Sequence, residues 1–162
     1  MRIGMGYDVH SVMPGRGVTL GGVRFPDTDF SLRGHSDADV LIHALCDALL
    51  GAAGLPDIGI LFPDHDTRHR DRDSMEFLSD VAARIRAEGY QAVNVDCMLI
   101  AEKPKIQDRV MEMKGRIGPV LGLETQAVGI KATTNEKLGS LGRGEGIAAM
   151  AVALLNIREA LA

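Results

Sequence analysis

Apolar residues recur at helical spacing in three segments of the chain, and each segment predicts an amphipathic helix. Ser36 or Asp37 can cap the first helix, the second begins at Ser74, and Pro104 suits the first turn of the third. The predicted core-facing stripes are Val40, Leu41, Ala44, Leu45, Ala48 and Leu49 in the first, Met75, Leu78, Val81, Ala82 and Ile85 in the second, and Ile106, Val110, Met113, Ile117 and Leu121 in the third.

Shorter β-prone runs lie between these helices and predict strands. Residues 92–101 alternate at first and then become continuously apolar, as a strand entering a core does, and residues 127–132 form another short strand. Residues 18–25 contain Gly21-Gly22 at their centre, which indicates a tight hairpin. Residues 147–161 leave two interpretations open, because their alanine content favours a helix while their alternation favours a strand.

The composition is that of an ordinary globular domain, so we expect one domain over residues 1–162. Aromatic residues make up only 4% of the chain and tryptophan is absent, so aliphatic side chains and eight methionines must form the core. Small side chains bury little area each, and such a domain gains from burying more surface between subunits. Oligomerisation is therefore an expectation.

The charge and the cysteine content limit the classes of binding partner and the cellular compartment that we expect. The net charge of −4 argues against nucleic acid as a partner, although backbone amides with one or two cations can still hold a single diphosphate. Cys46 and Cys97 lie in apolar runs, which favours buried reduced thiols in a cytoplasmic protein. The chain shows neither a signal-peptide pattern nor an apolar run near the roughly 20 residues that span a membrane, so we expect no membrane association.

Asp8 and His10 form a candidate metal site. If residues 1–10 are extended, these side chains lie on one face, because neighbours two apart in a strand point the same way. His43 is either a polar-margin residue of the first helix or the third ligand, and one Asp with two His would leave a fourth position open for substrate. Asp39 or Asp47, four residues either side of His43, could orient its free ring nitrogen.

Two polar segments also allow chemistry. Thr133-x-x-Glu136 has the form of a capping box, but the same residues, followed by flexible glycines, could instead hold a metal–diphosphate. The two interpretations stay open. The charged run of residues 65–73 could be a second metal site, but its irregular spacing favours a charged surface loop.

Several motifs in one order resemble the 2-C-methyl-D-erythritol 2,4-cyclodiphosphate synthase family. The resemblance covers residues 1 to about 158. The motifs are Asp8-Val9-His10, His35-Ser36-Asp37-Ala38-Asp39 with His43, Asp57-Ile58-Gly59, Phe62-Pro63-Asp64, Ala101-Glu102-Lys103-Pro104-Lys105, and Ala132-Thr133-Thr134-Asn135-Glu136-Lys137-Leu138-Gly139.

The resemblance implies a fold that periodicity alone does not provide. It is a single α/β (α+β) domain with a mixed four-stranded sheet and helices on one face. The family assembles as a homotrimer with active sites between adjacent subunits. Its last long segment is a strand, which resolves the ambiguity of residues 147–161.

The resemblance also implies the reaction. The family converts 4-diphosphocytidyl-2-C-methyl-D-erythritol 2-phosphate to the 2,4-cyclic diphosphate and releases CMP. Such a phosphoryl transfer depends on positioning and charge stabilisation. By match, Zn²⁺ or another divalent transition metal is bound by Asp8, His10 and His43, Mg²⁺ or Mn²⁺ is bound by Glu136, and the residues that stabilise the transition state are His35 and Thr134.

Substrate contacts follow from the same match, and the metal and catalytic residues are among them. The other implied positions are Ser36, Asp57, Ile58, Gly59, Phe62, Pro63, Asp64, His65 and Asp66, which include the methylerythritol side, and Ala101, Pro104, Lys105, Ile106, Ala132 and Thr133, which match the cytidine and phosphate pocket of the neighbouring subunit. Some relatives bind an isoprenoid diphosphate in an axial channel near the positions of Ser140, Arg143 and Glu145. Ser140 replaces a phenylalanine common in relatives, which predicts a wider or more polar channel.

Two rival functions differ in their products. A zinc-dependent phosphohydrolase with the same Asp-His-His site would activate water and release inorganic phosphate. A catalytically silent trimer would bind a nucleotide or isoprenoid diphosphate and release nothing.

Overall fold

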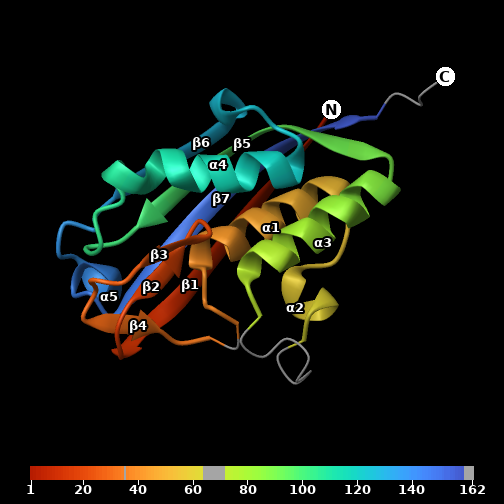
Figure 1. The fold of residues 1–162 in the computed structure, drawn as a ribbon. Helices are drawn as coiled ribbons and strands as arrows, with labels where there is room; N and C mark the ends of the chain where they lie inside the picture. Colours follow the sequence, from red (N-terminus) through yellow and green to blue (C-terminus); the bar gives the residue numbers. More distant parts are fainter. Residues whose placement is uncertain (35, 64–71, 159–162) are drawn as a thin grey trace.

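A mixed sheet with helices on one face makes up the described part of the chain, residues 1–34, 36–63 and 72–158 of the computed structural model (Figure 1). Its strand order is β4 (Phe30–Leu32), β1 (Arg2–Pro14), β7 (Gly146–Ile157), β5 (Tyr90–Ile100) and β6 (Val128–Thr133). Strands β5 and β6 run parallel, and the other neighbours pair antiparallel.

The predicted four-stranded sheet is wrong by one strand, since the described residues form five. The additional strand, β4, pairs only three residues with the end of β1, where Val12 lies opposite Leu32. A three-residue strand is too short to leave an alternating pattern in the sequence.

The last segment is confirmed as a strand. Strand β7 lies between β1 and β5, and its alanines Ala149, Ala151 and Ala153 are buried on the side that faces the helices. Small side chains there allow a helix to approach the sheet closely. The alanine content that favoured a helix therefore reflects tight helix-on-sheet packing.

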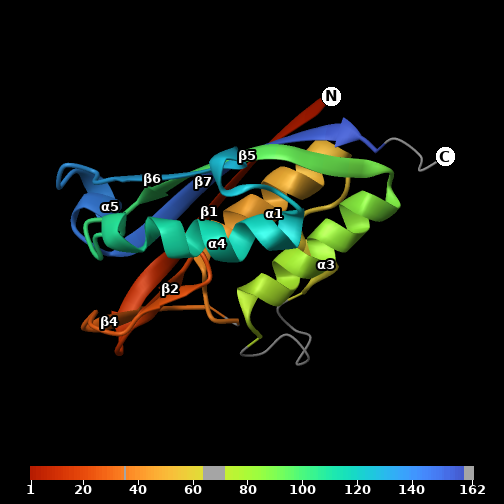
Figure 2. The ribbon, with the colours of Figure 1, turned by 45° about the horizontal axis from the view of Figure 1, so that its top comes forward.

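Three long helices lie against the same face of the sheet, as the two views of Figures 1 and 2 show. They are α1 (Val40–Ala53), α3 (Ser74–Ala87) and α4 (Val110–Leu121), and their apolar stripes join one buried cluster with β5, β6 and β7. The shorter elements are the predicted hairpin β2 (Val18–Leu20) and β3 (Val23–Phe25), the short helices α2 (Ile58–Leu61) and α5 (Gly139–Gly142), and 3₁₀ turns at Gln107–Arg109 and Thr125–Ala127.

Two predicted helix starts are wrong. Helix α1 is capped by Asp39 rather than by Ser36 or Asp37, because the buried Asp39 carboxylate accepts the N–H groups of Leu41 and Ile42. The same carboxylate accepts the N–H groups of Gly21 and Gly22 and so attaches the hairpin to the helix. Pro104 lies in a loop rather than in a first turn, since α4 begins only at Val110.

Glycines bring β1 and α1 unusually close. A Cβ atom at Gly6 would lie 1.9 Å from the carbonyl oxygen of Ala44, and one at Gly4 would lie 2.1 Å from that of Ala48. No other residue fits there without moving backbone atoms. These contacts fix the distance between β1 and α1, and therefore the distance between Asp8 and His10 on the strand and His43 on the helix.

The other face of the sheet carries exposed apolar residues, which we call the outer-face patch. It consists of Ile3, Met5, Tyr7 and Val9 from β1 and Met150 and Val152 from β7. The four β1 side chains are 47–72% exposed, so none of the described elements covers them. Among the described residues, no helix is long and apolar enough to cross a membrane.

Candidate metal centre and substrate cavity

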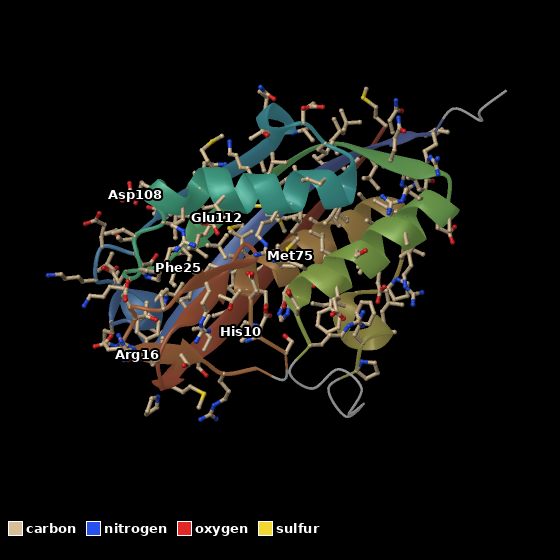
Figure 3. All side chains as sticks on the ribbon, viewed as in Figure 1. His10, Arg16, Phe25, Met75, Asp108 and Glu112 are labelled. Carbon is tan, nitrogen blue, oxygen red and sulfur yellow. The ribbon has the colours of Figure 1, made fainter. Side chains whose placement is uncertain are left out.

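Strand β1 and helix α1 bring Asp8, His10 and His43 together. Asp8 and His10 lie two residues apart on the helix-facing side of β1, and His43 lies in the first part of α1. Asp8 Oδ2 is 3.0 Å from His10 Nε2 and 3.1 Å from His43 Nδ1, and the two ring nitrogens are 3.0 Å apart. Figure 3 shows His10 on β1, near the end where α1 begins. The predicted convergence of these three side chains is confirmed.

The donor set fits a divalent transition metal. One carboxylate oxygen and two imidazole nitrogens all lie within 4.8 Å of one another, with His43 buried and the other two partly buried. Three such ligands are what a catalytic zinc site uses, with the fourth position open to substrate. His43 is therefore better described as a candidate ligand than as a residue at a polar helix margin.

The charge state of Asp8 favours the binding of a cation. Burial by itself raises the pKa of Asp8, but hydrogen bonds from His10 and His43 outweigh it and hold that pKa far below its ordinary value. Burial lowers the pKa of His10, and the hydrogen bond and charge of Asp8 reverse this, so the net change is upward. The Asp8 carboxylate is thus ready to accept a cation at neutral pH.

The far nitrogen of His43 is oriented by serines rather than by the aspartates predicted for that role. His43 Nε2 lies 3.0 Å from Ser74 Oγ and 3.2 Å from Ser36 Oγ, and Ser74 Oγ in turn donates to Asp37 Oδ1. Asp39 and Asp47 instead accept backbone N–H groups, including those of Leu41 and Ile58 respectively. Those aspartates are engaged because each stabilises the start of a helix.

Ser74→Ala is expected to weaken metal binding about tenfold, the lower end of what losing a ligand's outer hydrogen-bond partner costs. A metal on Nδ1 leaves the proton of His43 on Nε2, and the fully buried Ser74 hydroxyl accepts it. Competition with a chromophoric chelator measures the affinity. Ser79→Ala, an exposed position of the same helix, serves as the control. Equal affinities in the two variants would exclude this role for Ser74.

A cavity of about 360 Å³ opens beside the three ligands. It contains the predicted substrate positions Ser36, Ile58, Gly59 and Phe62, and adds residues that the sequence did not single out as lining it. Asp57 is not on its wall but caps α2 by accepting the N–H of Ile60 at 2.9 Å. The full lining is Asp8, His10, Arg33, Gly34, Ser36, His43, Asp47, Ile58, Gly59, Phe62 and Phe77.

A second, smaller cavity of about 100 Å³ lies where the parallel strands β5 and β6 end. It gathers the predicted cytidine and phosphate positions, and its lining is Ala101, Pro104, Lys105, Ile106, Gln107, Ala132, Thr133 and Thr134. The two cavities share no lining residue among those the structure describes. Within one chain, the predicted substrate positions therefore form two separate groups.

The loop after β6 excludes the capping-box interpretation of Thr133 and Glu136. No helix starts there in the described chain, since α5 begins at Gly139 and its N-cap Leu138 makes no side-chain capping bond. Glu136 has a left-handed backbone with φ 50°, and its Oε1 lies 3.4 Å from Thr134 Oγ1. The exposed Glu136 carboxylate is thus available to a cation.

Some predicted positions lie apart from these cavities. Ser140 lies in α5 and Arg143 directly follows that helix; both are exposed, and Arg143 pairs with Glu145 at 2.6 Å. Pro63 directly follows Phe62 but lines neither of the two cavities. His35, Asp64, His65 and Asp66, with most of the charged run 65–73, lie outside the described residues.

Comparison with known proteins identifies the family. Curated proteins named 2-C-methyl-D-erythritol 2,4-cyclodiphosphate synthase from Desulfatibacillum aliphaticivorans and Chlorobaculum tepidum are 54% and 55% identical over 156 residues. Both alignments cover 96% of this chain, with 100% and 99% of those proteins.

Solved structures agree with this likeness. The CDP complex of IspF from Plasmodium falciparum has a TM-score of 0.84 at 34% identity, over 98% of this chain and 97% of that one. The bifunctional IspDF from Campylobacter jejuni reaches 0.93 at 40% identity over 98% of this chain, which spans 42% of that longer protein. The model of the YgbB family matches residues 1–156, so the chain belongs to the YgbB family and the resemblance seen in its motifs is confirmed.

Proposed function

We propose that this chain is a 2-C-methyl-D-erythritol 2,4-cyclodiphosphate synthase, a lyase that forms a phosphorus–oxygen ring and releases CMP in isoprenoid precursor biosynthesis. The observation that carries the proposal is the Asp8–His10–His43 triad beside an open cavity. Curated relatives with this named activity are 52–55% identical along nearly the whole chain, which supports the same chemistry here.

The bond changes are simple. An oxygen of the substrate's 2-phosphate attacks the β-phosphorus, and the bond from that phosphorus to the oxygen bridging the α-phosphate breaks. The electron pair leaves with CMP, so the reaction consumes neither water nor a protein nucleophile. The protein must therefore position two phosphates and stabilise charge on their oxygens.

Each group of residues has its own role in the proposed reaction. Asp8, His10 and His43 would hold Zn²⁺, which would supply Lewis-acid stabilisation of phosphate charge, and Glu136 would hold Mg²⁺ or Mn²⁺, which would neutralise further phosphate charge. We assign stabilisation of the transition state to His35 and Thr134. Lys105 and Thr133, in the small cavity at the ends of β5 and β6, hold the phosphates, while Ala101, Ile106 and Ala132 contact the cytidine. The cavity beside the three ligands, whose lining includes Gly59 and Phe62, binds the methylerythritol part of the substrate.

The active form is a homotrimer in this proposal. The outer-face patch presents apolar side chains along two adjacent strands, and burying them against other copies would gain roughly 25 cal/mol per Å². The two separate cavities of one chain also suit a site in which one subunit supplies the triad and its neighbour the nucleotide pocket.

Two further parts of the proposal concern the location of the protein and a second ligand. We place the protein in the cytoplasm. Arg143 and Glu145 would face an axial channel for an isoprenoid diphosphate.

Product analysis tests the function. Purified protein with Zn²⁺, Mg²⁺ and the phosphorylated CDP-linked substrate should release CMP without inorganic phosphate. Release of inorganic phosphate would instead indicate a zinc phosphohydrolase. Binding of CDP with no CMP ever released would indicate a silent binding protein.

Glu136→Gln is expected to raise the Mg²⁺ concentration for half-maximal activity by about tenfold or more, because a neutral amide is a much weaker ligand for a hard cation. Zinc content should stay at the unmodified level, since Glu136 is not among the triad ligands. Glu124→Gln, an exposed glutamate whose side chain makes no capping bond, is the control. An unaltered Mg²⁺ titration in Glu136→Gln would refute the assigned role.

A further inference from the structure

We infer that Glu102 is a positioning residue that holds the Thr134–Lys137 loop in the conformation that presents Glu136. The inference rests on the proposed role of Glu136 as a divalent-cation ligand. Glu102 itself does not line the small cavity at the ends of β5 and β6, so it acts through the loop.

The sheet places Glu102 beside this loop. Strands β5 and β6 are parallel, so both end at the same edge, with Ile100 opposite Thr133. The pairing continues for one step beyond β5, since the N–H of Ala101 donates to the carbonyl oxygen of Thr133 at 3.0 Å. Glu102 is the next residue, directly beside the chain that leaves β6.

One oxygen of Glu102 accepts two backbone N–H groups from the loop. Glu102 Oε1 accepts from Asn135 N at 3.1 Å and from Lys137 N at 3.4 Å. These two amides flank Glu136 on either side. The carboxylate therefore fixes the backbone direction on both sides of the residue that carries the candidate cation ligand.

The loop needs such support because its backbone is strained. Glu136 and Lys137 are consecutive non-glycine residues with φ of 50° and 61°. A left-handed backbone is unfavourable for each of these non-glycine residues and persists only where the surroundings determine it. Without an external partner, the chain would relax toward an ordinary conformation and carry Glu136 away from its present position.

A second contact holds the loop from the other side. A Cβ atom on Gly142 of α5 would lie 2.2 Å from the carbonyl carbon of Lys137, so α5 packs directly on the loop backbone. Within the loop, Asn135 Nδ2 also donates to the carbonyl oxygen of Leu138 at 2.8 Å. The hydrogen bonds to Glu102 and the packing of Gly142 thus hold the loop backbone from two sides, and we call these contacts the clamp. In the clamp, Glu102 acts as a hydrogen-bond acceptor, and its negative charge is not required.

The experiment compares Glu102→Ala with Glu102→Gln, which keeps a carbonyl oxygen at the same reach. Amide hydrogen exchange at Asn135 and Lys137 reports the clamp directly, and the Mg²⁺ concentration for half-maximal CMP release reports its consequence. Glu124→Ala is the control for loss of an exposed glutamate. Zinc content is measured in parallel.

Glu102→Ala removes both hydrogen bonds to the carboxylate. It should accelerate exchange at both amides and raise the Mg²⁺ requirement, each by about tenfold or more. Glu102→Gln should restore most of both, and zinc content should not change. Unchanged exchange in Glu102→Ala would overturn the inference, as would a glutamine variant no better than alanine. If the unmodified protein releases no CMP, the proposed function fails, and the exchange data still decide on the clamp.

Discussion

Replacing His43 with alanine is expected to remove bound metal and cyclising activity together. His43 supplies one of three protein ligands, and its Nδ1 lies within 3.1 Å of both the Asp8 oxygen and the His10 nitrogen that complete the set. The two remaining ligands bind the ion too weakly to retain it during dialysis. We expect the metal affinity and the rate each to fall by more than roughly a hundredfold, beyond what an outer hydrogen-bond partner contributes.

Elemental analysis after dialysis and the rate of CMP release measure this prediction. Cys46→Ala provides the control, because Cys46 is also buried, lies about one turn further along α1, and is not part of the ligand group. It should lose some stability and keep its metal. A His43→Ala protein that retains full zinc content would remove His43 from the ligand set.

Gly6→Ala is expected to produce the largest loss of stability. The added methyl would lie 1.9 Å from Ala44 O and 2.7 Å from Ala48 N, both backbone atoms of α1 that cannot rotate away. The helix must therefore move from the sheet, at a cost of about 3 kcal/mol or more. Because Asp8 lies two residues along β1 and His43 lies on α1, the same movement separates the metal ligands.

Urea denaturation and chelator competition should thus show a joint loss of stability and metal affinity in Gly6→Ala. Gly51→Ala is the matched control in α1, since the nearest atom to its added methyl lies 4.0 Å away and alanine favours a helix. Its stability should equal or exceed that of the unmodified protein by up to about 1 kcal/mol. Equal stability of the two variants would contradict the close-packing account of α1 and β1.

The parts of the fold predictable from the sequence are those specified by local periodicity. Asp8 and His10 are two apart, so extended backbone alone puts them on one face. The apolar stripe of α3 likewise follows from spacing within a single helix. Such relations involve neighbours in the chain and need no knowledge of the fold.

The parts that could not be predicted depend on contacts between distant segments. Ser74 meets His43 across 31 residues, and nothing in either local sequence indicates that contact. Asp39 has the spacing to reach His43, but the hairpin N–H groups of Gly21 and Gly22 occupy its carboxylate. The resemblance resolved β7 as a strand, while the alanines that made it ambiguous are explained only by the closeness of α1.

The measurement that most directly tests the central claim is mass spectrometry of the organic phosphate product formed in isotopically labelled water. Internal attack by the 2-phosphate predicts a cyclic diphosphate and CMP, both free of label from the water. A linear phosphate product, or any product that carries labelled oxygen, would show that water is the nucleophile and would contradict the cyclising mechanism.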